Sequence, residues 1–188
     1  MVCLGGCGAS VPSSGTKFLP VPTGSAVYTG NLAKTTTGSA IDPNSSTLVS
    51  YSEVQTVAGT ITVNARFDTG TTTVSVSNPS IDFIRSSTDS SAPRYNFIEE
   101  SSYSGTVSGT GSVLGSSFDG NLAGALTQNS SDRSPVSGAA PEQFAGTMAG
   151  QIAGTNFSLA TGTLNLSHTV SGQTVPFLSD FGFSAMRN

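Results

Sequence analysis

The sequence predicts an all-β fold, a single antiparallel up-and-down barrel, and three observations lead to that prediction. First, a seven-residue pattern recurs along the chain: aromatic, any residue, Gly, Thr or Asn, apolar, small, then usually Gly. Second, apolar and polar residues alternate with a period of two, as they do in half-buried strands. Third, the pattern places a Gly beside an aromatic residue on the same face. Gly weakens a strand unless a bend or a neighbouring ring needs the space, and small barrels fill their interiors with alternating large and small residues.

The repeated pattern has four close copies, which begin at Tyr28, Tyr103, Phe118 and Phe144, and a looser copy begins at Val57. On a strand, the aromatic residue, the first Gly and the apolar residue of each copy share one face. We interpret the copies as barrel strands rather than as a glycan-binding or sensing blade, because their other faces carry no convergent acids, amides or rings. The residues predicted for the barrel interior are Tyr103, Phe118, Phe144, Phe157, Ile61, Val63, Phe67, Val74, Val76, Val107, Leu122 and Met148.

The composition excludes several classes of protein. The chain has 188 residues, which suits one domain with its own core. Its net charge is −4, and only 10% of its residues are charged, so no basic patch exists to bind nucleic acid. No apolar run is long enough for a membrane helix. Ser and Thr together number 56, which suits a surface-exposed or secreted β protein with hydroxyl-covered strands.

Near the N-terminus, Leu4-Gly5-Gly6-Cys7 resembles the lipobox of bacterial lipoproteins, in which the Cys becomes the acylated first residue. A lipobox follows a charged region and an apolar region, and only three residues precede Leu4 here. The resemblance therefore requires a signal peptide upstream of Met1, or it is accidental. A Cys3–Cys7 disulfide and two free thiols are the competing interpretations. We expect lipid attachment at Cys7.

Residues 1–25 are expected to form this lipobox-like start and a flexible tether rich in Pro, Gly and Ser, and residues 26–188 the barrel domain. The clearest hairpin pairs 54–67 with 71–77 around Asp68-Thr69-Gly70. Further strands are expected at 26–33, 46–53, 81–84, 95–98, 144–154, 156–167 and 175–186, besides the two in the repeat 103–126. Loops or turns are expected at 35–46, 78–80, 85–94 and 127–141. A short helix over 141–154 is the alternative there, but Gly146, Gly150 and Gly154 disfavour it.

Three stretches resemble the barrel domains of the transferrin-binding protein B family and its small lipoprotein relatives in Gram-negative bacteria. They are TVAGTITVNARFDTGTTTVSVSNPSIDF, SYSGTVSGTGSVLGSSFDGNLAGAL and PEQFAGTMAGQIAGTNF, within about residues 51–166. The resemblance implies a barrel of about eight strands on an outer-membrane lipoprotein that binds a host protein, a metal or haem carrier, or another cell-surface partner. This chain has room for one barrel, and Thr147-Met148-Ala149-Gly150 replaces the aromatic-Tyr-Gly-Pro stretch of the family, so the family's ligand specificity does not transfer.

Catalysis finds little support, and no catalytic residue, metal ligand or cofactor is predicted. His168 is the only His, and a single His beside a strand end is expected to be an ordinary surface residue. A Ser-His-Asp arrangement stays open because Ser is abundant, but the sequence lacks a Gly-x-Ser-x-Gly elbow. Metal-binding Cys/His spacing, phosphate loops and calcium repeats are also absent from the sequence. The adjacent acids Glu99 and Glu100 would point to opposite faces of a strand.

Three functions remain open. In the first, a lipid-anchored outer-membrane barrel binds a protein or nutrient-carrier partner through its loops. The residues predicted to contact the partner are Arg85, Asp89, Arg94, Asn129, Asp132 and Arg133. In the second, the chain is a structural surface, adhesin or virion-shell protein, extracellular or on a virion, that assembles with itself or a neighbour. The third is a membrane-spanning barrel, which we disfavour because its strands should be 9–11 residues long with an outward apolar band.

Overall fold

The computed structural model of the protein describes residues 22–41, 50–87, 97–131, 134–135, 138–170 and 172–188. These residues form β-strands and one short 3-10 turn (η2, Thr155–Phe157). The strands are β1 (Ser25–Ile41), β2 (Ser50–Arg66), β3 (Thr71–Ser87), β4 (Phe97–Leu114), β5 (Ser117–Ser131), β6 (Ser134–Pro135), β7 (Glu142–Ala153), β8 (Leu159–Val170) and β9 (Gln173–Arg187).

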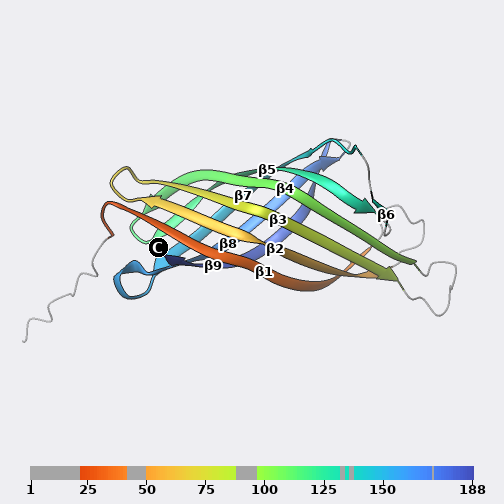
Figure 1. The fold of residues 1–188 in the computed structure, drawn as a ribbon, viewed down its shortest axis with the longest axis horizontal. Helices are drawn as coiled ribbons and strands as arrows, with labels where there is room; N and C mark the ends of the chain where they lie inside the picture. The colour runs from red at the N-terminus through yellow and green to blue at the C-terminus, as the bar shows by residue number, and fades with distance from the viewer. Residues whose placement is uncertain (1–21, 42–49, 88–96, 132–133, 136–137, 171) are drawn as a thin grey trace, which may run out of the picture.

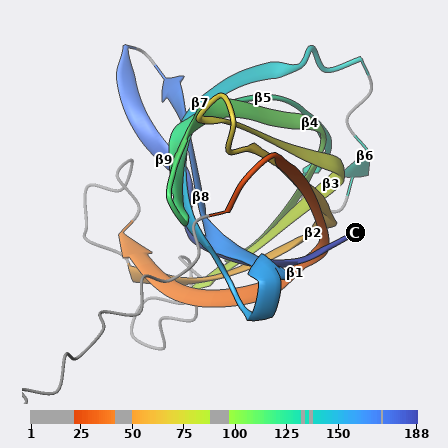
Figure 2. The ribbon, with the colours of Figure 1, turned by 90° about the vertical axis from the view of Figure 1, so that its left-hand side faces the viewer.

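The strands close into a single up-and-down barrel, as predicted. The antiparallel order is β4-β3-β2-β1-β9-β8-β7-β5, and β4 also pairs with β5, which completes the ring of eight. The two-residue β6 extends the edge of β5. Figure 1 shows the barrel from the side, with the C-terminus at its left-hand end and β6 at its right-hand end, and Figure 2 shows the strands surrounding the interior. The all-β class and the barrel of about eight strands are therefore confirmed.

The repeated pattern pairs with a reversed copy of itself, so that a large residue meets a small one. Phe118 of β5 lies opposite Gly150 of β7, and Phe144 of β7 lies opposite Gly124 of β5. Gly150 has no room for a side chain, because a Cβ there would collide with the Phe118 ring and with the Thr161 carbonyl oxygen of β8. Bare backbone on one strand thus provides the space for a ring on the next, as the sequence predicted.

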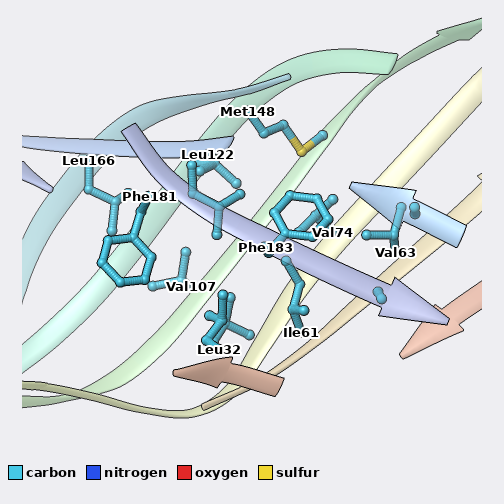
Figure 3. Close-up of a cluster of buried hydrophobic side chains, with 14 of the residues drawn as sticks. Leu32, Ile61, Val63, Val74, Val107, Leu122, Met148, Leu166, Phe181 and Phe183 are labelled. Atoms are coloured by element: carbon cyan, nitrogen blue, oxygen red, sulfur yellow. The ribbon is translucent and has the colours of Figure 1, made fainter. Parts of the chain in front are cut away.

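Most of the residues predicted for the interior are buried. Figure 3 shows side chains from several strands converging on one apolar cluster. Of the predicted residues, nine are buried: Ile61, Val63, Val74, Val76, Val107, Phe118, Leu122, Phe144 and Met148. Phe67, Tyr103 and Phe157 are partly buried and pack against this cluster. All three lie toward the ends of the barrel, where the interior opens to solvent.

Two irregularities change which residues face inward. In β3 the register with both neighbours shifts near Asn78, whose φ is 51°. The inward positions therefore change from even numbers, ending at Val76, to odd numbers, beginning at Pro79. In β9 the register with β8 shifts between Leu178 and Phe181, next to Asp180 with φ of 53°. These are β-bulges, which bend and twist a strand without ending it.

The seam between the first and last strands is narrow. β1 pairs with β2 along all 17 of its residues, whereas its pairing with β9 is confined to Tyr28 and Thr29. Farther along β1, the Lys34 Nζ donates to the Asp180 carbonyl of β9 at 3.2 Å and lies 5.4 Å from the centre of the Phe181 ring. Side chains therefore hold the part of this seam that backbone hydrogen bonds leave open.

Several predicted boundaries are wrong, because the strands are longer than the sequence suggested. β1 continues to Ile41 through the start of the expected loop at 35–46, and 46–53 and 54–67 belong to one strand from Ser50 onward. The expected turn at 78–80 is the bulge inside β3, which also contains 81–84. Asn78-Pro79-Ser80 has the composition of a turn, but pairing with β2 and β4 before and after the bulge keeps β3 intact. The extension of β1 pairs with β2 alone. Residues 42–49 lie outside the described part.

The C-terminal half shows similar differences. β5 extends to Ser131 into the expected loop at 127–141, and β6 lies within that loop. The strand expected at 144–154 is β7 and the helical alternative is wrong. The strand expected at 156–167 begins only at Leu159, after the 3-10 turn. The strands have 12 to 18 residues, leaving out β6, so the argument from strand length against a membrane barrel is wrong.

The outward face of the strands is largely small and hydroxylated. Among the described residues, the exposed large hydrophobic side chains come from four different strands: Val27, Ile84, Leu114, Val175 and Met186. Val27 and Met186 are near neighbours across the seam between β1 and β9, and the other three lie apart from them on β3, on β4 and near the start of β9. The expectation of hydroxyl-covered strands is thus met over the part of the chain that the structure describes.

Candidate functional site

The two ends of the barrel are built differently. At one end, which we call the tight-turn end, lie the turns at 67–70 and 115–116, the 3-10 turn, the start of β1 and the end of β9. At the other end, the long-connection end, lie the strand ends joined by residues 42–49, 88–96 and 132–141. The short connection between β8 and β9, from Val170 to Gln173, also lies at this end. Figure 1 shows these as the left-hand and right-hand ends. Both segments predicted to bind a partner therefore connect strands at the same end.

A cluster of five rings closes the interior near the long-connection end, and we call it the aromatic floor. Its members come from five strands: Phe83, Tyr103, Phe144, His168 and Phe177. Phe177 is central, because its ring centre lies 5.0 Å from Phe83, 5.1 Å from Tyr103, 4.5 Å from Phe144 and 5.9 Å from His168. His168 stacks on Phe144 with an interplanar angle of 6°.

Strand geometry explains how these rings meet. His168 shares the inward face of β8 with Leu164 and Leu166, and it lies opposite Phe144 in β7. The register shift in β9 between Leu178 and Pro176 places both Leu178 and the intervening Phe177 against the interior. A regular strand would have turned one of these two neighbours outward. The irregularity thus supplies the ring that joins the other four.

Polar groups lie around the aromatic floor. The Arg85 Nε donates to a Glu53 carboxylate oxygen at 2.6 Å, and the Arg85 guanidinium lies 5.7 Å from the centre of the Phe83 ring. Gln55, only 8% exposed, donates from Nε2 to the Phe177 carbonyl oxygen at 2.8 Å. His168 Nδ1 lies 3.6 Å from a Glu142 carboxylate oxygen. Charges of both signs therefore lie beside rings at this end.

The surroundings of Tyr103 change the pKa of its phenol. Burial raises its pKa above the ordinary value of 10.0, and the Glu142 carboxylate raises the pKa further. Arg85 and a hydrogen bond with the Ser101 side chain lower the pKa by smaller amounts. The net direction is upward, so Tyr103 keeps its proton and can donate a hydrogen bond at neutral pH.

One open cavity joins the aromatic floor to the outside. Its volume is about 870 Å³, and Tyr103, Glu142, Phe144 and His168 line it. The remaining lining residues are polar or small: Gln143, Ala145, Ser167, Thr169 and Thr174. A cavity with ring faces, one carboxylate and several hydroxyls can bind a ligand group through stacking, charge and hydrogen bonds.

A second cavity lies at the tight-turn end, with a volume of about 760 Å³. Phe67, Ile152, Phe157 and Arg187 are among its lining residues. At this end, the Tyr28 hydroxyl of β1 donates a hydrogen bond to the Phe157 carbonyl oxygen of the 3-10 turn at 3.0 Å. Pro22 and Thr23 also line it, so the chain enters the barrel beside this cavity.

The structure brings one of the predicted partner-binding residues to the aromatic floor. Arg85 faces the interior beside Phe83. Asn129 does not join it, because its amide exchanges hydrogen bonds of 2.9 and 3.1 Å with the hydroxyl of Ser104 on the outer face of β4. The other predicted site residues lie outside the described part of the chain: Cys7, Asp89, Arg94, Asp132 and Arg133.

Sequence reasoning missed three contributors to this site. His168 was expected to be an ordinary surface residue, but it is stacked on a ring and only 25% exposed. Its alternation with Leu164 and Leu166 was the available signal. Glu142 precedes Phe144 by two residues and so shares its face, which the sequence also shows. Nothing in the sequence marked Phe177, because its position depends on the irregular pairing of β9.

The described residues contain no group of three or more His, Cys, Asp or Glu side chains placed to hold a metal ion. They also contain no helix of the length and apolarity needed to cross a membrane. Comparisons of the chain with protein-family models, with characterised proteins and with solved structures find no match.

Proposed function

We propose that the protein is a non-enzymatic, surface-exposed lipoprotein whose barrel binds a protein or nutrient-carrier partner at the long-connection end. The observation that supports this most directly is the division between the two ends. The chain enters the barrel at the tight-turn end, beside Phe67, whose backbone N–H donates to Gly24. The aromatic floor and the connections proposed to contact the partner lie at the opposite end.

A lipid on Cys7 fits this arrangement. Fourteen residues lie between Cys7 and Pro22, and a fully extended chain of that length spans at most about 50 Å. An anchor at Cys7 would hold the tight-turn end toward the outer membrane and leave the long-connection end facing outward. The resemblance to the small relatives of transferrin-binding protein B supports the same arrangement, and no cofactor or nucleic acid is required.

The anchor is tested by the intact mass of the protein recovered from its native membrane fraction, before and after lipase treatment. We expect a mass that shows acylation at Cys7 and loss of the preceding residues. An unmodified chain that begins at Met1 would contradict lipid attachment and leave only the partner-binding part of the proposal.

Partner binding is tested by replacing Ser130–Gly138 with a short Gly-Ser turn. The replacement removes only the last two pairs between β5 and β4, at Ser130 and Ser131, and lies beyond the last pair between β5 and β7, at Leu126 and Glu142. The melting curve should therefore stay nearly unchanged while partner binding is lost. Replacing Gly115-Ser116 at the tight-turn end with another two-residue turn is the matched control, and it should preserve binding. A Ser130–Gly138 replacement that still binds the partner would contradict the assignment.

One observation favours a second candidate, a structural surface protein that assembles with itself. β1 has backbone pairing with β9 at only two residues, and an unpaired strand edge is a template for another chain. Light scattering over a range of protein concentrations tests this candidate. A monomer at every concentration would count against self-assembly, and oligomers that disappear when the edge of β1 is blocked by Pro would support it.

A further inference from the structure

The cavity at the long-connection end combines ring faces with one carboxylate. Tyr103, Phe144 and His168 contribute rings, and Glu142 contributes the carboxylate. The rings are fixed by their contacts with Phe177 or with each other, at centre distances between 4.5 and 5.9 Å. A rigid set of rings needs little ordering when a ligand binds, so less affinity is lost to entropy.

The charges around this cavity favour a cation. Among the residues that the structure describes, no Lys or Arg lines the cavity. Arg85, which lies beside the aromatic floor, is paired with Glu53 and is not among the lining residues of the cavity. Glu142 is 50% exposed and its contact with His168 is 3.6 Å long, so an approaching ligand can reach the carboxylate. The net charge of the whole chain, −4, also attracts cations.

Ring faces and a carboxylate together select an organic cation over a neutral group. The face of an aromatic ring carries negative potential and attracts an ammonium or guanidinium group. The aliphatic stem of a Lys or Arg side chain packs on apolar surface while its charged end seeks an acid. The cavity offers both kinds of contact within one space, and the hydroxyls of Thr169 and Thr174 add hydrogen-bond acceptors at its border.

We infer that this cavity receives a basic side chain, Lys or Arg, presented by the protein partner at the long-connection end. The inference rests on the proposed function and gives it a chemical specificity: the partner contacts the barrel through an exposed basic residue. Tyr103 provides a ring face, Glu142 provides the opposite charge, and His168 borders the bound group. Phe144 is buried and supports the His168 ring by stacking on it.

His168 makes the test direct, because it is the only histidine and its imidazole gives a single set of NMR signals. The probes are two short peptides with blocked ends, Gly-Gly-Lys-Gly-Gly and its Nζ-acetyl-lysine twin, which differ in charge at one atom. We expect the Lys peptide to shift the His168 signals along a saturable curve, with an affinity about tenfold higher than that of the acetylated peptide. Equal affinities, or no saturable shift up to about 100 mM peptide, would overturn the inference.

Variants show whether the effect belongs to this cavity. Glu142→Gln should remove most of the preference for the Lys peptide, whereas Asp68→Asn, which removes the same charge at the tight-turn end, should keep it. Tyr103→Leu should weaken binding and Tyr103→Phe should restore it, because the Phe variant keeps the ring. Equal losses in Glu142→Gln and Asp68→Asn would show a general effect of net charge and would overturn the inference.

Different results would contradict the inference and the proposed function. Equal binding of the two peptides overturns the inference whatever the replacement of Ser130–Gly138 does to partner binding. Unchanged partner binding after that replacement overturns the proposed function whatever the peptides do.

Discussion

The two ends of this barrel place their aromatic residues in different surroundings. Toward the tight-turn end, the ring of Phe118 is buried and covers bare backbone at Gly150, with no charged group among its ring and glycine contacts. At the long-connection end, Phe83 and Phe144 contact Arg85 and His168, and a buried amide, Gln55, supports Phe177. The same strands thus provide packing at one end and chemically varied side chains at the other. Stability should depend more on the first end and binding more on the second.

The largest expected effect is the loss of stability when an aromatic ring is removed from each end. Phe118→Ala should lower the free energy of unfolding by about 3–5 kcal/mol, because it leaves a cavity against Gly150. Phe177→Ala should cost less, about 2 kcal/mol, because this ring is only partly buried. Urea unfolding followed by circular dichroism measures both. An equal or larger loss for Phe177→Ala would show that the aromatic floor is a main source of stability.

The next effect concerns Gln55, which links β2 to β9 across the interior. Gln55→Leu should cost about 1–3 kcal/mol, because the Phe177 carbonyl oxygen loses its amide donor. Gln143→Leu is the matched control: Gln143 is exposed on β7, and the change should stay within about 0.5 kcal/mol. Similar unfolding free energies for the two variants would remove Gln55 from the support of the aromatic floor.

Alkaline pH acts on both ends, since one end has the buried Tyr28 and the other the partly buried Tyr103. Burial raises the pKa of Tyr28 and of Tyr103 above the ordinary value of 10.0. A raised folded pKa favours the protonated phenol, so its contribution to stability is complete below pH 10.0 and is lost as the pH rises through the folded pKa. Thermal unfolding across this range should show the loss, and Tyr103→Phe should reduce it. A melting temperature independent of alkaline pH would contradict the direction of both shifts.

The smallest expected effect compares two arginines. Arg85→Ala and Arg66→Ala should each cost no more than about 1 kcal/mol, because both ion pairs are partly exposed. The two variants should differ in binding, since Arg85 lies at the long-connection end and Arg66 at the other. Partner binding measured by surface plasmon resonance should weaken for Arg85→Ala alone. Equal binding by both variants would separate Arg85 from the partner surface.

Much of the fold could be predicted because the repeated pattern places an aromatic residue of one copy opposite a Gly of the neighbouring copy. Phe118 and Gly150 stand at opposite ends of their copies, so antiparallel pairing brings them together. Strand boundaries were harder to predict. Asn78-Pro79-Ser80 has the composition of a turn, yet the strand continues through it as a bulge. The local sequence at such a position permits either a turn or a bulge, and pairing with the neighbouring strands determines which of the two forms.

The candidate site was predictable only in part. Tyr103 and Phe144 were expected in the interior and Arg85 on a binding segment, but nothing in the sequence showed that they meet. Their meeting depends on the curvature of the sheet and on Phe177, which the register shift between Leu178 and Pro176 brings inward. Sites assembled from five strands in this way depend on the closed barrel, and alternation along any single strand does not reveal them.

The narrow seam between β1 and β9 sets the order of assembly. Tyr28 pairs with Arg187, so ring closure joins nearly the first described residues to nearly the last. The hairpins between neighbouring strands need only local loop closure, whereas this pairing must organise more than 150 intervening residues. The hairpins can therefore form before the barrel closes, and the barrel cannot close until the chain is available as far as Arg187. Until then, β1 stays competent to pair with a different strand.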